Sequence, residues 1–135
     1  MDDCVFCKIV NGQIPSAKIY ENEKVLAFLD IAPVNKGHVL IIPKEHYEKL
    51  EDMPDNIIKE VFVAAKKISM AIKKGVDCNA INFGMNNGKE AGQLVMHAHI
   101  HVMPRFKGDG LKLWPQGKYE ELEMENFREK IKRFL

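Results

Sequence analysis

Residues 96–103 read Met96-His97-Ala98-His99-Ile100-His101-Val102-Met103, and this stretch decides the fold. Three of the five histidines of the chain stand here at every second position, and apolar residues fill the positions between them. Because successive side chains of a strand point to opposite faces, His97, His99 and His101 are expected to share one face, about 6.5 Å apart along the strand. The intervening apolar residues then point into a core. Three imidazoles in a row are difficult to explain as packing, since each buried ring needs hydrogen-bond partners.

The composition is that of one soluble globular domain spanning residues 1–135. The net charge of +1 indicates no basic surface for a nucleic acid, so no nucleic-acid partner is expected. No apolar run is long enough to cross a bilayer, so no membrane partner is expected either. The start of the chain lacks the basic and apolar parts of a signal peptide. Three cysteines make a poor disulfide framework. Reduced thiols and a cytoplasmic location follow.

Cys4 and Cys7 form a Cys-x-x-Cys pair near the N-terminus. Such a pair is typical of a redox dithiol or of half of a zinc site. The redox interpretation needs a preceding strand, which is missing here. The zinc interpretation needs two further ligands, and histidines are available to supply them. Zinc is therefore favoured, with two unrelated thiols as the alternative.

The hydrophobic pattern predicts two helices and several short strands. Strands are expected at 25–29, 38–43 and 80–85, and a further extended segment at 14–20. A short helical turn is expected at 6–10. The clearest helix covers 52–74, with Pro54 near its start and Gly75 just past its end. A second helix is expected at 119–135, with an apolar side formed by Leu122, Phe127, Ile131 and Phe134.

The other two histidines flank one of these strands, because His38 opens the segment 38–43 and His46 follows it. Two adjacent antiparallel strands would bring them close to the 97–101 row. Residues 86–93 form a polar loop that carries Gly88 and Gly92 and leads into that row. Glycines permit close backbone approach there, and exposed N–H groups in such a loop bind anions.

Imidazole is both a nucleophile and a leaving group near neutral pH, and it carries protons. A row of imidazoles beside an anion-binding loop suits transfer of a phosphoryl or nucleotidyl group without a metal at the reacting atom. The competing chemistry is hydrolysis by a metal ion held by histidines. That geometry is poor, since the outer histidines of a strand lie about 13 Å apart.

The motif His97-Ala-His99-Ile-His101-Val-Met103 resembles the signature of the histidine-triad (HIT) family. The similarity extends from Cys4 to Arg105, about three-quarters of the chain. Its other motifs are Ile14-Pro15-Ser-Ala-Lys18-Ile19, Phe28-Leu29-Asp30-Ile31, Lys36-Gly37-His38, Ile42-Pro43-Lys44-Glu-His46, Asn86 and Gly92-Gln93.

The resemblance implies an α+β fold, an antiparallel sheet of about five strands with one long and one C-terminal helix, paired into a homodimer. It implies hydrolysis or transfer of a purine nucleotide through a nucleotidyl-histidine intermediate on His99. His101 would bind phosphate oxygens, and His38 would help to fix the tautomer of His99. Asp30 would bind the ribose, and Asn86 and Gln93 the phosphate or the leaving group. The implied nucleotide site comprises Phe6, Ile9, Phe28, Leu29, Asp30, Ile31, Asn86, Gly92, Gln93, His99 and His101.

Some members of the family, and related uridylyltransferases, bind a structural zinc, and the matching residues here are Cys4, Cys7, His46 and His97. One zinc per chain and no organic cofactor are implied. Two departures leave the leaving group open between a phosphoramidate amine, an acyl group and a second nucleotide. Leu94 stands where the Hint branch commonly has serine, and Met103-Pro104-Arg105 is more like other branches. Two alternatives are a nucleotide-binding regulator with incidental hydrolysis and a metal-dependent hydrolase.

Overall fold

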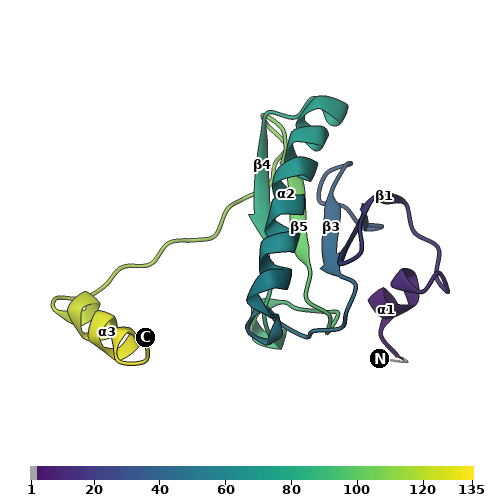
Figure 1. Ribbon diagram of the computed structural model, residues 1–135. Coiled ribbons are helices and arrows are strands. Elements are labelled where there is room, and N and C mark those ends of the chain that lie inside the picture. The colour runs from purple at the N-terminus through teal and green to yellow at the C-terminus, as the bar shows by residue number, and fades with distance from the viewer. Residues whose placement is uncertain (1–2) are drawn as a thin grey trace.

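The computed structural model describes residues 3–135, and its centre is a five-stranded sheet in the order β1-β2-β3-β5-β4 (Figure 1). All neighbouring strands are antiparallel. The strands are β1 (Lys18–Glu21), β2 (Val25–Leu29), β3 (Val39–Pro43), β4 (Ala80–Gly84) and β5 (Ile100–Arg105). The helices are α1 (Val5–Val10), α2 (Asp55–Val76) and α3 (Glu123–Lys132), with short 3₁₀ turns η1 (Leu50–Asp52) and η2 (Lys89–Ala91). The predicted α+β class, antiparallel sheet and long and C-terminal helices are confirmed.

The long helix α2 packs along one face of the sheet. Its six buried residues recur at helical spacing, so they form a single stripe toward the strands: Ile57, Val61, Ala64, Ala65, Ile68 and Ile72. The predicted end at Lys74 is wrong by two residues. Gly75 lies inside the helix, which continues to Val76 because Asp77 adopts the left-handed conformation (φ 54°) that terminates it.

The inner strands carry apolar side chains on both faces, because both faces are covered. On β2, Val25 and Ala27 join the core under α2, while Leu26 and Phe28 point to the other face. There they meet Phe6 of the short helix α1. The continuous apolar run of β2 therefore follows from its position between α2 on one face and α1 on the other.

Strand β5 and the residues before it follow the alternation expected from sequence. Ala98, Ile100 and Val102 are buried in the core under α2. The hydrogen-bonded strand begins at Ile100, so His97 and His99 precede it, and His97 lies in a bend that covers residues 95–97. Ala98 is held there by its N–H, which donates to the carbonyl of Tyr47 at 2.6 Å.

The C-terminal helix is shorter than predicted. It covers Glu123–Lys132 instead of 119–135, and it stands apart from the sheet at the end of an extended segment (Figure 1). Its predicted apolar side does not pack on the sheet, since none of its residues is buried.

Within residues 3–135, no helix combines the length and the apolar character that crossing a membrane requires.

We expect Ile41→Ala to lower the free energy of unfolding by about 3 kcal/mol, because the side chain is fully buried between β3 and α2 and its loss leaves a cavity. Urea denaturation measures the change. The matched control is Ile19→Ala, whose side chain is 46% exposed, with an expected loss below about 1 kcal/mol. Equal losses in the two variants would contradict this description of the core.

Candidate active site

His99 presents one ring nitrogen as a free lone pair. Its Nδ1 lies 2.7 Å from the backbone carbonyl oxygen of His97, and a carbonyl can only accept a hydrogen bond. Nδ1 therefore carries the proton, and Nε2 of the neutral ring keeps its lone pair. Burial lowers the pKa of His99, against the opposing effects of this carbonyl and of Asp30, so the neutral form is favoured.

His101 presents an N–H through a second chain of hydrogen bonds. The N–H of Val34 donates to Nδ1 of His38 at 3.1 Å, so Nε2 of His38 carries the proton of the neutral ring. That Nε2 lies 2.9 Å from Nδ1 of His101, which must accept, and the remaining proton of His101 is therefore on Nε2. Burial, with smaller contributions from His99 and His38, lowers the pKa of His101 to about 4.

The expectation that His38 fixes the tautomer of His99 is wrong. His38 bonds to His101 and determines that tautomer instead, while the carbonyl of His97 determines the tautomer of His99. A sequence pattern could not separate these roles, because one of the two tautomer-fixing partners is a backbone group. Asp30 stands beside the pair, with its Oδ2 3.6 Å from Nε2 of His38.

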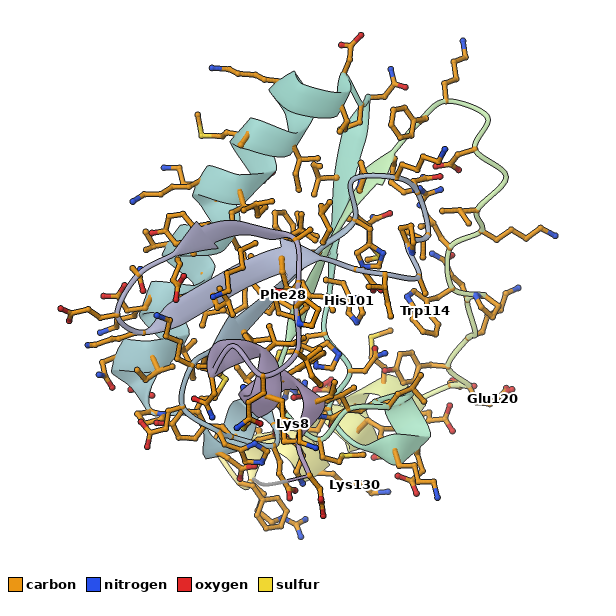
Figure 2. All side chains as sticks on the ribbon, turned by 90° about the vertical axis from the view of Figure 1, so that its right-hand side faces the viewer. Lys8, Phe28, His101, Trp114, Glu120 and Lys130 are labelled. Atoms are coloured by element: carbon orange, nitrogen blue, oxygen red, sulfur yellow. The ribbon has the colours of Figure 1, made fainter. Side chains whose placement is uncertain are left out.

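A cavity of about 640 Å³ opens beside His99 and His101, within the size range of small-molecule sites. In Figure 2, Phe28 and His101 lie together near α1, and both line this cavity. The ring of Phe6 meets that of His99 edge to face at 5.1 Å. The structure gathers ten of the eleven predicted nucleotide-site residues here: Phe6, Ile9, Phe28, Leu29, Asp30, Ile31, Asn86, Gly92, His99 and His101.

Gln93 is the predicted residue that does not reach the cavity. Its side chain is 2% exposed, and its amide group forms hydrogen bonds with backbone groups of the protein. Nε2 donates to the carbonyls of Glu48 and Val95, and Oε1 accepts from the N–H of Gly88. Its expected contact with phosphate or leaving group is therefore wrong, and its role is to fix the loop before the histidines.

The loop that bears Asn86 depends on a glycine. Gly92 has φ 93°, a conformation that side chains disfavour, and a Cβ there would lie 3.3 Å from Nδ2 of Asn86. The same Nδ2 donates to the carbonyl of Gly92 at 3.3 Å. Glycine thus permits the approach that places Asn86 at the cavity.

Leu94, which the sequence analysis singled out, also lines the cavity. Seven further lining residues were not anticipated from the sequence: Val5, Ile14, Pro15, Ser16, Ala32, Leu40 and Val95. Within residues 3–135, the Oγ of Ser16 is the one buried side-chain oxygen or nitrogen without a hydrogen-bond partner. The neighbouring Ile14-Pro15 belonged to a quoted motif, but apolar wall residues carry no chemical signal that separates them from core residues.

Asp30 is oriented by its own turn. One carboxylate oxygen, Oδ1, accepts from the N–H of Ala32 at 2.8 Å, as a turn-forming aspartate does. The other oxygen remains at the cavity, close to His38. The carboxylate is thus a fixed hydrogen-bond acceptor at the end of β2.

The four residues predicted to bind zinc come together at the opposite end of the histidine row. Nδ1 of His97 lies 3.4 Å from Sγ of Cys4 and 3.6 Å from Sγ of Cys7, and Nδ1 of His46 lies 3.3 Å from Sγ of Cys7. All four donor atoms lie within 4.8 Å of one another. Tetrahedral zinc with ordinary bond lengths separates nitrogen and sulfur ligands by about 3.5 Å, so the set fits this metal.

Two further features suit a metal site. Nε2 of His97 lies 2.8 Å from the carbonyl of Pro43, which orients the ring and leaves Nδ1 toward the thiols. Burial and the neighbouring Cys4 raise the pKa of Cys7 to about 11. Without a cation the Cys7 thiol therefore stays protonated near neutral pH, and a bound metal ion would stabilise its thiolate form.

His97 and the other triad histidines thus belong to different clusters. Donor atoms of Asp30, His38 and His101 also lie within 4.8 Å of one another, but the two ring nitrogens share a hydrogen bond at 2.9 Å. A metal there would have to displace the proton that this bond contains.

Comparisons with known proteins identify the family of the chain. The family model described as "HIT domain" matches residues 11–108. A crystal structure of a HIT family member from Bacillus subtilis is 44% identical, covers 98% of this chain and 97% of its own, and superposes with a TM-score of 0.91. The chain therefore belongs to the HIT family.

Three other relatives carry informative names. Adenylylsulfatase HINT3 of Arabidopsis thaliana is 44% identical over 82% of this chain and 56% of its own length. Adenosine 5'-monophosphoramidase HNT1 of Candida albicans is 37% identical over 98% of this chain and 91% of its own. A zinc-bound histidine triad family protein from Mycobacterium smegmatis is 35% identical, covers 99% of each chain and has a TM-score of 0.79.

We expect the protein to lose stability as the pH falls from about 6.5 to about 4. Burial lowers the pKa of His101 to about 4, so over this interval the unfolded chain takes up a proton that the folded chain does not. The contribution of the neutral His101 ring to stability is complete above its pKa in the unfolded chain. It is lost as the pH falls toward its lower pKa in the folded chain. Urea midpoints across this range measure the effect. His101→Asn, which keeps Cys4, Cys7, His46 and His97, is expected to show a smaller acid-side decrease, and identical pH profiles would contradict the assignment.

Proposed function

We propose that this chain is a nucleotidyl hydrolase or transferase that works through a covalent intermediate on His99. The supporting observation is the pairing of a lone pair on Nε2 of His99 with an N–H on Nε2 of His101, both at one cavity. In such a pair the ring of His99 is a nucleophile and the ring of His101 is a hydrogen-bond donor, and both rings are neutral. Both groups are available at neutral pH, since burial lowers the pKa of each ring.

The reaction proceeds by two displacements at the α-phosphorus of a nucleotide. Nε2 of His99 attacks, the bond from phosphorus to nitrogen forms, and the bond to the leaving group breaks with its electron pair. The N–H of His101 donates to a phosphate oxygen as negative charge develops there. Water then attacks the same phosphorus, releases the nucleoside monophosphate and restores the lone pair of His99. The leaving group takes a proton from solvent as it departs in the first displacement, and the attacking water returns a proton to solvent in the second, so the protons balance over the cycle.

The remaining cavity residues bind the nucleotide. Phe6 and Phe28, with Ile9, form the apolar part, which suits a purine base. Asp30 accepts hydrogen bonds from the ribose hydroxyls. Asn86 and the N–H groups near Gly92 contact the phosphate.

The leaving group is the variable part of the substrate. The names of two relatives share an adenosine 5'-phosphate portion and differ in what is removed from it, an amine in one and sulfate in the other. We favour nucleoside phosphoramidates as substrates, with dinucleoside polyphosphates as the second class to be tested.

We also propose that Cys4, Cys7, His46 and His97 hold one structural zinc ion. The donor set and its spacing fit tetrahedral zinc, and a relative from Mycobacterium smegmatis is described as zinc-bound. Zinc at a closed Cys2His2 site would stabilise the attachment of α1 to the sheet. Because the thiols must stay reduced, a cytoplasmic location suits this site.

His99→Ala is expected to abolish turnover of an adenosine phosphoramidate, a loss of about 10⁴-fold or more, because the nucleophile is gone. Turnover and calorimetric binding of AMP measure the two properties separately, and binding should persist. His101→Ala is the comparison variant. It keeps the nucleophile and loses one donor, so a smaller decrease of about 10²–10³-fold is expected.

Substantial turnover by His99→Ala would contradict the assigned nucleophile. Tight AMP binding by the wild type without turnover of any phosphoramidate or dinucleoside polyphosphate would identify a nucleotide-binding regulator instead. Loss of activity on chelation from a protein that stays folded would favour the metal-dependent alternative.

Cys4→Ser is expected to remove zinc, because one of its four ligands is lost. Elemental analysis of the purified protein measures the metal content, about one ion per chain in the wild type. Cys78→Ser is the matched control, since Cys78 packs against the core under α2, away from the proposed ligands. Unchanged zinc in Cys4→Ser, or equal loss in both variants, would reject the ligand set.

A further inference from the structure

The N–H of Val34, which determines the tautomers of His38 and His101, belongs to a loop with little packing of its own. Residues 31–34 are all exposed, with Ile31 at 101% and Val34 at 43%. No buried apolar side chain therefore anchors this part of the loop to the core. Because exposed loops are mobile unless they are tied down, the position of the Val34 N–H depends on the polar contacts beside it.

Asn35, the residue after Val34, supplies such a contact. Its Nδ2 donates to the carbonyl of Pro104 at 2.9 Å and to Oδ2 of Asp109 at 3.0 Å, which accounts for both of its amide hydrogens. Its own backbone carbonyl accepts from the N–H of His38 at 3.1 Å. The side chain of Asn35 thus connects the loop to the end of β5, and its backbone connects the loop to the histidine.

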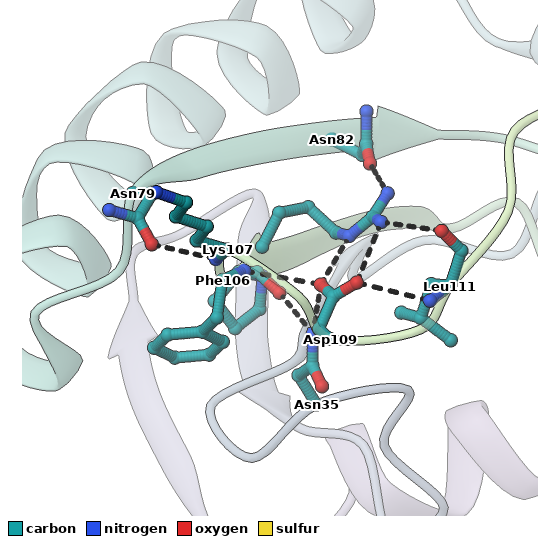
Figure 3. Close-up of polar contacts among 9 residues, drawn as sticks. Asn35, Asn79, Asn82, Phe106, Lys107, Asp109 and Leu111 are labelled. Atoms are coloured by element: carbon teal, nitrogen blue, oxygen red, sulfur yellow. Dashed lines mark hydrogen bonds and ion pairs between the residues drawn. The ribbon is translucent and has the colours of Figure 1, made fainter.

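The carboxylate that accepts from Asn35 is itself fixed, as Figure 3 shows. The side chain of Asp109 is 7% exposed, and it accepts from the guanidinium of Arg105 at 2.7 and 3.0 Å. It also accepts from the N–H groups of Phe106 and Leu111. The Arg105 guanidinium holds the pKa of Asp109 well below its usual range, so the carboxylate stays charged. A charged acceptor in a fixed position strengthens the hydrogen bond from Asn35.

We propose that Asn35 is a positioning residue, whose amide keeps the proton of His101 on the nitrogen that faces the cavity. With the Val34 N–H on its Nδ1, His38 has its proton on Nε2 and donates to His101. Without that N–H, the proton of His38 can occupy Nδ1, so its Nε2 becomes an acceptor and the proton of His101 is found on Nδ1. His101 then offers phosphate a lone pair instead of an N–H. The effect on the tautomers rests on geometry alone, and the effect on catalysis rests on the proposed function.

Two other groups near the loop act elsewhere. Oδ2 of Asp30 lies 3.6 Å from Nε2 of His38, too far for a hydrogen bond, although its charge favours a proton there. Gly37, at φ 98°, lies so close to Val76 that a Cβ would stand 3.0 Å from that side chain, and this contact fixes the return of the loop to β3. The segment that carries Val34 is left to the amide. Because Asp30 still favours one tautomer, loss of the amide should give a mixture.

Asn35→Ala removes the amide, and the ¹⁵N shifts of the imidazole rings measure the result, because protonated and unprotonated ring nitrogens differ widely in shift. In the wild type at neutral pH we expect a protonated Nε2 and an unprotonated Nδ1 in both His38 and His101. In the variant we expect intermediate shifts at all four nitrogens and faster hydrogen exchange of the Val34 amide. Asn35→Asp keeps the shape but loses both N–H donors, so it should change the rings in the same way if Asn35→Ala does not fold.

Asn79→Ala is the matched control. Asn79 is an exposed asparagine whose Oδ1 accepts from the N–H of Lys107 at 2.9 Å, in the same turn but apart from Asn35 (Figure 3). It makes no contact with the loop that carries Val34, so its loss should leave the ring shifts as in the wild type. Wild-type ring shifts in the Asn35 variants, or equal changes in Asn79→Ala, would overturn the proposal.

Turnover of an adenosine phosphoramidate tests the consequence for the reaction. We expect Asn35→Ala to lower kcat by about 10-fold to 100-fold with little change in KM, because the donor to the phosphate is present in only part of the molecules. The ring measurements use no nucleotide, so the two inferences can fail separately. Unaltered rings would refute positioning by Asn35, whereas altered rings with an unchanged kcat would refute the role proposed for the N–H of His101.

Discussion

The site depends on one constraint, the burial of Ala98, Ile100 and Val102 beneath α2. Because side chains alternate along an extended chain, burying these three fixes the three neighbouring imidazoles on the opposite face. A slip of one residue would exchange the two sets, placing the imidazoles in an apolar core without partners. The core under α2 therefore sets the register of the chemical groups.

The same constraint divides the three histidines between two tasks. His97 faces Cys4, Cys7 and His46, while His99 and His101 face the cavity. The two tasks are joined through the backbone, because the carbonyl of His97 bonds to Nδ1 of His99. The tautomers that the proposed chemistry needs are thus fixed by two main-chain groups, this carbonyl and the N–H of Val34. Burial keeps the rings neutral, so a nucleophile and a hydrogen-bond donor can exist side by side at the same pH.

Much of this arrangement could be predicted from the sequence, because it follows from local patterns. Period-two alternation predicts β5, and the 3.6-residue period predicts α2. The Cys-x-x-Cys pair indicated half of a metal site, but its two histidine partners were identified only by the resemblance to the HIT family. Other features depend on partners that no pattern reveals. Gln93 is polar and lies next to the site, yet its amide forms hydrogen bonds with three backbone groups and is not available to a ligand. The partner of His38 follows from the pairing of β3 with β5, which sets Leu40 opposite His101. The amphipathic pattern of α3 is real, but a pattern does not say where the helix lies, and none of its residues is buried.

The central claim is that two successive displacements occur at phosphorus, the first by His99. The most direct test is the stereochemistry of hydrolysis of one epimer of a nucleoside 5'-phosphorothioate carrying an amine leaving group, in water labelled with ¹⁸O and read by ³¹P NMR. Each in-line displacement inverts the phosphorus centre, so our account predicts net retention of configuration. Net inversion would show that water attacks directly, and would contradict the covalent histidine intermediate.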